Sequence, residues 1–398
     1  MEYPEFLKKG NTIGLVAPSF GCSFEPYLSR YEYALNQFKE MGYYVNEGPN
    51  CRLGEGVGIS NIPRECAREL EEYYVNPDID FVLSCGGGEL MCETISELDF
   101  NPIRNSRPKW YMGYSDNTNF SFLSATILDR AALYGPCASN FGRHPWHESI
   151  NDALDVITGR NLVVHNYDKY EIESPSDEEH PTEAYNCTEK VDIKCYVMST
   201  GNNYVNDIMF TDNKNVNDVM LIDNNNVNEL MSTNNKNVND VTLTDMNYVN
   251  KVMLTDSISI EGRLLGGCLD ILTNIAGTRY DYVNRFNQKY RDDGVIWFLE
   301  ACDLNVFDIR RALWHLDEAG WFNNAKAFIF GRPRCGESMF NLDEVGACLK
   351  HTLMKHNVPV IMGADIGHVP PMMTLITGAY SKVDFNNGHL VIDMGYEL

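Results

Sequence analysis

The chain has 398 residues, of which 44% are hydrophobic and 11% aromatic, so it is long enough for two domains with separate cores. Its formal net charge of -24 argues against nucleic-acid binding, because phosphates are bound by clustered Lys and Arg. No apolar run approaches the length of a membrane span, and the acidic start does not match a signal peptide. The twelve cysteines form no Cys-x-x-Cys pair and no zinc-like cluster, so we expect reduced thiols, no metal, no cofactor and a cytoplasmic location.

The first 160 residues alternate between strand and helix patterns and form the predicted N-terminal domain, 1–160. Apolar runs predict strands, and amphipathic spacing ended by Gly or Pro predicts helices. This alternation favours a parallel sheet covered on both faces, with ligands at the carboxyl ends of its strands. The expected strands cover 12–18, 79–89, 109–116 and 132–136, and the expected helices cover 27–42, 64–76 and 147–159.

The middle of the chain departs from this pattern. Residues 161–201 include the acidic, Pro-containing stretch "ESPSDEEHPTE" and are predicted to be a linker. A Val-Asn pair then recurs every 11 residues, five times within 202–256. The Asn and Asp content disfavours a helical supercoil, so we interpret 202–256 as an insertion of strand-turn units or flexible loop without chemistry of its own.

The strand and helix patterns resume in the predicted C-terminal domain, 257–398. Residues 259–278 suggest a strand, a Gly-Gly turn and a helix. A buried strand at 294–301 precedes an amphipathic helix at 307–322. Further strands are expected at 325–333 and 358–368, and the chain ends in a meander over 374–394 with a turn at 386–388.

Ser115 lies where a predicted buried strand ends and a helix begins. A nucleophilic serine needs such an exposed position, a base to remove its proton and N–H donors for the oxyanion. Serine is also a preferred helix N-cap, so on local sequence alone Ser115 can equally be a cap.

Two other strand ends carry groups that could complete a triad. Glu300 follows the apolar run "VIWFL", and His368 follows "IMGADIG". Glu300 could instead form a structural ion pair with an arginine, and a lone histidine such as His368 is often structural. Serine, glutamate and histidine in this order form a possible triad, although their spacing does not show that they meet.

Two further segments are candidates for substrate contact. The glycines at 86–88 can let backbone N–H groups approach a ligand, although Gly-rich turns can also simply turn. Trp146 and His147 lie in a loop and could stack on a planar group, or Trp146 could simply anchor the loop.

The sequence resembles the LD-carboxypeptidase family of serine peptidases, which includes the microcin C immunity peptidases. The motifs "GLVAPS", "GYSDNT", "YGP", "EGRLLGGCLDIL", "WFLEA" and "GHVPPMMTLITG" carry the resemblance over about 1–160 and 258–398. It implies a flavodoxin-like, parallel-sheet N-terminal domain, a C-terminal α/β domain with barrel-like strands, and a homodimer. It also implies site residues: the triad Ser115, Glu300 and His368, oxyanion donors Gly87 and Asp116, and substrate contacts at Gly86, Gly88, Trp146 and His147.

Three residue patterns depart from the family: Cys268 where Asn is common, Ala301 where a polar residue is common, and "TLITG" for "TLPLG". They affect the expected substrate fit more than catalysis. We therefore expect a serine carboxypeptidase that cleaves the L,D-bond to the terminal D-Ala of murein tetrapeptides. One alternative is an immunity-type peptidase acting on aminoacyl-nucleotide amides, and another is a non-catalytic binding protein that uses its repeats.

Overall fold

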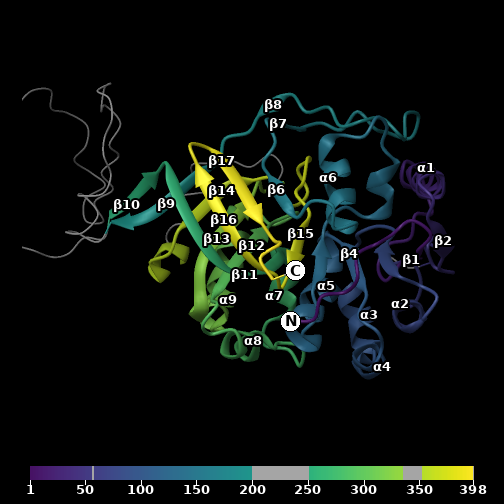
Figure 1. Cartoon of the computed structure of the whole chain (residues 1–398), viewed down its shortest axis with the longest axis horizontal. Coiled ribbons are helices and arrows are strands. Elements are labelled where there is room, and N and C mark those ends of the chain that lie inside the picture. The colour runs from purple at the N-terminus through teal and green to yellow at the C-terminus, as the bar shows by residue number, and fades with distance from the viewer. Residues whose placement is uncertain (56–57, 200–250, 335–351, 398) are drawn as a thin grey trace, which may run out of the picture. The chain divides into compact units, whose positions relative to one another are not determined.

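The computed structural model describes residues 1–55, 58–199, 251–334 and 352–397 (Figure 1). The repeats predicted over 202–256 lie outside these residues except for 251–256. By its contacts the chain divides into two units, one made of Met1–Val197 with Leu254–Leu398 and the other of Met198–Met253. The first unit contains the candidate site and both large sheets, except for residues 198–199 and 251–253 in two strands at the edge of one sheet.

A six-stranded sheet forms the N-terminal half of this unit. Its order is β15-β5-β4-β3-β1-β2, in which the first five strands of the chain run parallel and β15 joins antiparallel. The order 2-1-3-4-5 is that of flavodoxin-like sheets, as predicted. The strands are β1 (Thr12–Val16), β2 (Tyr44–Glu47), β3 (Phe81–Ser84), β4 (Trp110–Gly113), β5 (Ala132–Tyr134) and β15 (Leu375–Thr377).

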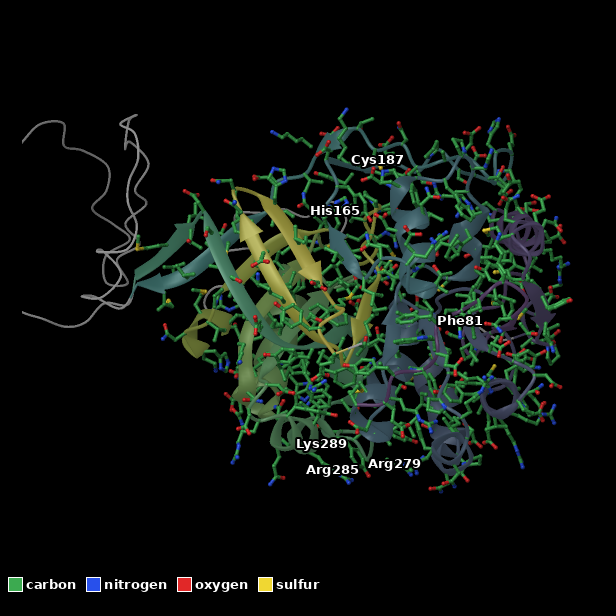
Figure 2. The ribbon with its side chains drawn as sticks, viewed as in Figure 1. Phe81, His165, Cys187, Arg279, Arg285 and Lys289 are labelled. Atoms are coloured by element: carbon green, nitrogen blue, oxygen red, sulfur yellow. The ribbon has the colours of Figure 1, made fainter. Side chains whose placement is uncertain are left out.

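Helices cover both faces of this sheet, with α1 and α6 on one side and α2, α3 and α4 on the other (Figure 1). Phe81 lies among the packed side chains of the sheet (Figure 2). The predicted helices form almost where the pattern placed them, and α2 starts at a proline, which suits the first helical position. The helices are α1 (Tyr27–Glu40), α2 (Pro63–Val75), α3 (Met91–Glu97), α4 (Phe100–Asn105), α5 (Thr118–Leu123) and α6 (Glu148–Ile157), with short η1 (Ser115–Asn117), η2 (Ser124–Leu128) and η3 (Ala138–Gly142).

A nine-stranded mixed sheet forms the other half. Its order is β10-β9-β14-β13-β12-β11-β16-β17-β6, with β11 to β14 parallel at the centre. The mixed α/β class with parallel-strand sheets is thus confirmed. The strands are β6 (Val163–His165), β9 (Lys194–Ser199), β10 (Lys251–Thr255), β11 (Ser257–Cys268), β12 (Val295–Glu300), β13 (Ala325–Gly331), β14 (Val360–Ala364), β16 (Tyr380–Asn386) and β17 (His389–Asp393).

Short helices and one small hairpin complete the described residues. The helices are α7 (Leu269–Ile275), α8 (Val283–Lys289), α9 (Val306–Glu318), η4 (Trp321–Asn324) and η5 (Met354–His356), and β7 (Lys169–Tyr170) pairs with β8 (Glu189–Lys190). Within the described ranges, no helix has the length and apolar character that crossing a bilayer requires.

The structure differs from the sequence prediction at Gly266-Gly267, which is not a turn. Both glycines lie inside β11, where they pair with Phe298 and Leu299 of β12. A β-carbon at Gly266 would lie 1.7 Å from the Phe298 carbonyl oxygen, so only glycine allows the two strands to approach this closely.

The segment 161–201, predicted as a linker, contains four strands in its described part. Two of them belong to the nine-stranded sheet: β6 pairs antiparallel with β17, and β9 pairs antiparallel with β14. The backbone N–H of Tyr167 donates to Asp365 Oδ2 at 2.7 Å. These contacts tie the segment to the C-terminal strands, so the prediction of a linker was wrong for these residues. The strands were missed because short, polar strands that pair with their neighbours have no clear apolar pattern.

Candidate active site

Ser115 lies two residues after the end of β4 and begins η1, which runs into α5. The N-cap of η1 is Tyr114, and that of α5 is Asn117. Among the described residues, none forms a hydrogen bond with Ser115 Oγ. The local alternative, a serine that caps the helix, therefore does not describe the structure.

Ser115 has a left-handed backbone, with φ of 63°. A residue with a β-carbon pays about 1–2 kcal/mol for this conformation. Strained residues of this kind cluster at functional sites, where the surrounding structure holds them in place. At this turn between strand and helix, Ser115 lines a cavity.

The glycine turn at 86–88 lies next to Ser115. A β-carbon at Gly87 would lie 3.3 Å from both Cβ and Oγ of Ser115. The turn is fixed through its carbonyl groups, since Gly87 O accepts from the Phe20 N–H at 2.8 Å and Gly86 O accepts from Asn117 Nδ2 at 2.9 Å. Within the described chain the Gly87 N–H donates to no other residue, so it is available to an oxyanion beside Ser115.

Asp116 is buried, and its carboxylate holds the turn rather than facing the cavity. It accepts from the Ser19 hydroxyl, from the Met91 N–H at 2.8 Å and from Asn119 Nδ2 at 2.9 Å. Burial raises the pKa of this carboxyl, and the three donors counteract that rise. These contacts keep the Asp116 backbone fixed at the start of η1, where N–H groups favour anions.

Glu300 and His368 meet as the triad hypothesis requires. Glu300 is the last residue of β12, and His368 lies in the loop after β14. Their side chains are joined by a hydrogen bond of 2.8 Å between His368 Nδ1 and Glu300 Oε2. Nε2 is thereby left as the nitrogen that can exchange a proton with Ser115 or a substrate.

Tyr134, at the end of β5, connects this pair to Ser115. Its hydroxyl donates to Glu300 Oε1 at 2.6 Å and accepts from the Ser115 N–H at 3.2 Å. Glu300 is completely buried, and Tyr134 occupies its second oxygen. Sequence reasoning did not identify Tyr134, although it belongs to the "YGP" motif at a strand end.

The charges of Glu300 and His368 support each other. Burial alone raises the pKa of Glu300, but the charge and hydrogen bond of His368, together with Tyr134 and Cys268, hold it below its usual value. Burial alone lowers the pKa of His368, but Glu300 and the nearby Cys302 thiol raise it above its usual value. The carboxylate therefore stays ionised and favours the protonated imidazole.

Two thiols flank the pair. Cys268 is opposite Glu300 in the β11–β12 register, and Cys302 follows β12. The Asp270 carboxylate accepts from the Cys302 N–H at 3.1 Å and from the Asp303 N–H at 3.0 Å, which fixes the turn after Glu300. Cys268, Glu300 and His368 each offer one possible metal ligand atom, all within 4.8 Å, but the Glu300–His368 hydrogen bond already engages two of these groups.

A cavity of about 830 Å³ opens onto these residues. Ser115, His368 and the glycines 86–88 line it, and so do Tyr114 and the aromatic side chains of Phe20, Phe24 and Tyr27. Its charged lining comprises Arg30, Arg143, Arg334, Glu89 and Glu171. The cavity is large enough for more than one amino-acid residue.

Trp146 and His147 do not line this cavity. Trp146 donates from Nε1 to the Phe141 carbonyl at 2.9 Å and packs edge-on against the Phe141 ring. His147 caps α6, accepting from the Ser149 N–H at 3.2 Å, and burial lowers its pKa. Trp146 thus anchors the loop, which was the alternative to substrate stacking.

Comparison with known sequences identifies two domains of one family. The sequence pattern of the LD-carboxypeptidase N-terminal domain matches residues 13–135, and that of the LD-carboxypeptidase C-terminal domain matches residues 261–383. A putative carboxypeptidase of Vibrio cholerae is 23% identical, covering 97% of this chain and 96% of its own.

Two other relatives have named activities. The microcin C7 self-immunity protein MccF of Escherichia coli is 25% identical, covering 84% of this chain and 79% of its own. A probable murein peptide carboxypeptidase of Bacillus subtilis is 22% identical, covering 98% and 94%. The structure of MccF in complex with glutamyl sulfamoyl guanosine superposes with a TM-score of 0.70 at 20% identity, covering 99% of this chain and 98% of that one. That likeness shows a common fold.

Proposed function

Because the chain belongs to the LD-carboxypeptidase family, we propose that it hydrolyses an amide bond of a small substrate with Ser115 as nucleophile, His368 as base and Glu300 as the group that orients His368. The observation that carries this proposal is the Glu300–His368 hydrogen bond of 2.8 Å beside a strained serine in one cavity. The order of roles follows the logic of serine hydrolase triads.

In the proposed first half-reaction, Ser115 Oγ attacks the substrate carbonyl carbon while His368 Nε2 takes the hydroxyl proton. The carbonyl oxygen becomes an oxyanion and accepts from the N–H groups of Gly87 and Asp116. The C–N bond then breaks, and His368 gives the proton to the leaving amine. Glu300 stays ionised throughout and stabilises the imidazolium.

In the second half-reaction, water attacks the ester carbonyl of the acyl-enzyme and gives one proton to His368. Collapse of this intermediate breaks the C–O bond to Ser115, and His368 returns the proton to Oγ. Ser115 Oγ and His368 form no hydrogen bond in the structure, and such contacts often tighten only when substrate binds.

The substrate we favour is a murein tetrapeptide, cleaved at the L,D-bond before its terminal D-Ala. The relative from Bacillus subtilis supports this choice. The expected products are a tripeptide and free D-Ala. In this proposal the enzyme is a homodimer and acts in the cytoplasm.

A second candidate substrate is an aminoacyl-nucleotide amide. Phe20, Phe24 and Tyr27 pack edge-on against one another at the cavity, with centroids 5.2–5.7 Å apart, and Phe24 is 54% exposed. Exposed rings of this kind can stack on a nucleobase. MccF, which binds glutamyl sulfamoyl guanosine, supports this alternative.

The proposed function is tested by incubating the purified chain with murein tetrapeptide and, separately, with aspartyl sulfamoyl adenosine, and detecting products by mass spectrometry. We expect Ser115→Ala to lose at least about 10³-fold in rate while keeping its thermal unfolding transition. Near-normal turnover by Ser115→Ala would show that another group is the nucleophile.

A binding protein that works through its repeats is the competing class. Replacing 202–250 by a short linker should leave an enzyme that still reacts with a covalent serine probe, because both family patterns lie outside the repeats. Absence of probe labelling in the intact chain would favour the binding protein.

A further inference from the structure

We propose that Arg334 binds the acidic group of the leaving amine, and so determines that substrates are cleaved next to a charged end. For the favoured substrate this group is the carboxylate of the terminal D-Ala, and for the alternative it is the phosphoryl or sulfamoyl group. The inference rests on the proposed function and adds the residue that recognises the leaving group.

Arg334 is held at the triad by its backbone. It follows the end of β13, and its N–H donates to the carbonyl of Ala301, the residue after Glu300, at 3.1 Å. Because β12 and β13 are parallel neighbours, the loops after them leave the sheet on the same side. Arg334 therefore lines the same cavity as Ser115 and His368.

The Arg334 guanidinium is exposed and nearly unused. Nη1 donates to the Cys302 thiol at 3.6 Å, and the same thiol helps to raise the pKa of His368. Of the carboxylates that the structure describes, none lies within ion-pair distance of Arg334. A guanidinium has five N–H donors and can donate two of them to two oxygens of one carboxylate or phosphate group. Arg334 therefore keeps enough donors for such a contact.

The other two arginines of the cavity are engaged. Arg143 forms an ion pair with Glu171 at 3.6 Å and donates to Ser174 Oγ at 2.7 Å. Arg30 donates from Nε to the Pro181 carbonyl at 2.7 Å. These contacts hold the segment 171–185 against the N-terminal half.

Cations elsewhere on the described surface do not compete for this role. Arg279 and Lys289, at the edge of the molecule near α8, lie outside the cavity (Figure 2). Arg279 donates to the Ser96 carbonyl at 2.9 Å, and Lys289 pairs with Asp129. Among the described residues that line the cavity, Arg334 is therefore the arginine left to bind a substrate anion.

Its position also explains which side of the scissile bond it serves. Nδ1 of His368 is bound to Glu300, so Nε2 is the ring nitrogen left to deliver a proton to the leaving amine in the proposed reaction. The Cys302 thiol lies beside both His368 and Arg334. An anion held by Arg334 thus lies on the side where His368 delivers its proton.

The test compares three substrates: murein tetrapeptide, the same peptide with a C-terminal carboxamide, and aspartyl sulfamoyl adenosine. Arg334→Gln should raise KM and lower kcat/KM for the acid peptide about 10- to 100-fold, since hydrogen bonds to charged groups are strong, and leave the carboxamide unchanged. Arg334→Lys should recover part of the loss, because it keeps the charge but not the paired donors. Arg291→Gln, an exposed arginine paired with Asp292, is the matched control.

A loss confined to aspartyl sulfamoyl adenosine would identify the sulfamoyl group as the group that Arg334 binds. Equal losses on acid and carboxamide, or no loss on any substrate, would overturn the inference. If the wild-type chain hydrolyses none of the three, the proposed function fails. Calorimetric binding of acid and carboxamide peptides to Ser115→Ala, with and without Arg334→Gln, then decides the anion site separately.

Discussion

Gly367 and Glu300 are in such close contact that a β-carbon at position 367 would lie 2.4 Å from Glu300 Oε2. This oxygen is the one that accepts from His368 Nδ1. Gly367 also has φ of 96°, a conformation that side chains rarely adopt. The absence of a side chain at 367 is thus what allows the carboxylate and the imidazole of the next residue to meet.

We expect Gly367→Ala to lower kcat/KM at least about 100-fold, because a displacement of about 1 Å in a catalytic group has effects of that size. The loss is measured as kcat/KM and, independently, as a lower rate at which a covalent serine probe labels Ser115. Gly277→Ala is the matched control: Gly277 has φ of 76°, but nothing lies within 4 Å of its β-carbon position. Gly277→Ala should lose about 1 kcal/mol of stability through its backbone angle and keep its activity. Gly367→Ala should lose more stability, because it adds the close contact with Glu300, and should also lose activity.

Ser115 offers a test of stored strain. Since its φ of 63° favours glycine, we expect Ser115→Gly to be more stable than Ser115→Ala by about 1 kcal/mol, although neither hydrolyses substrate. Chemical denaturation of the two variants measures the difference. Equal or lower stability of the glycine variant would show that the surroundings, not the backbone angle, set the energy of this turn.

The pH dependence follows from the raised pKa of His368. The imidazole must be neutral to accept the Ser115 proton, so kcat/KM should rise with pH, with a midpoint above 6.5, the usual value for histidine. In Glu300→Gln the carboxylate charge that raises the pKa of His368 is absent, so the midpoint should shift to lower pH than in the wild-type chain. A wild-type midpoint at or below 6.5 would contradict this account.

The same shift affects stability. A histidine whose pKa is raised by folding stabilises the folded chain fully below its unfolded pKa, and this contribution is lost as the pH rises through the folded value. We therefore expect the melting temperature to decrease over the alkaline range in which kcat/KM increases. Glu300→Gln should not show this decrease.

Trp146 provides a test of the loop assignment. Trp146→Ala should lower the free energy of unfolding by about 2 kcal/mol, since it removes a partly buried ring and a hydrogen bond to Phe141. The ratio of kcat/KM values for peptide and nucleotide substrates should stay constant. Trp314→Ala, at a 59% exposed tryptophan on α9, should change neither quantity. A selective loss on the nucleotide substrate would restore Trp146 as a stacking residue.

Much of the fold follows from local sequence. The helices α1, α2 and α6 and the strands β1, β3, β4 and β5 form where apolar patterns and Gly or Pro endings predict them. The edge strand β2 was not predicted, because its residues are exposed or only half-buried and carry no apolar run. Asn386-Asn387-Gly388 likewise predicts the turn between β16 and β17. Local patterns also predicted the candidates Ser115, Glu300 and His368, because each lies at or shortly after the end of a strand.

Tertiary structure alone decided what connects these strand ends. The Tyr134–Glu300 hydrogen bond joins residues 166 positions apart, and the pairing of Cys268 with Glu300 depends on the β11–β12 register. Likewise, only the contacts of Arg30 with Pro181 and of Arg143 with Glu171 distinguish Arg334 from the other arginines of the cavity. Packing on Phe141 places Trp146 outside the cavity. The spacing of apolar residues shows which face of a helix or strand is buried, so the sequence by itself determines these elements. Residues distant in sequence are brought into contact by the packing of the whole chain. The arrangement of the site was therefore decided by the tertiary structure.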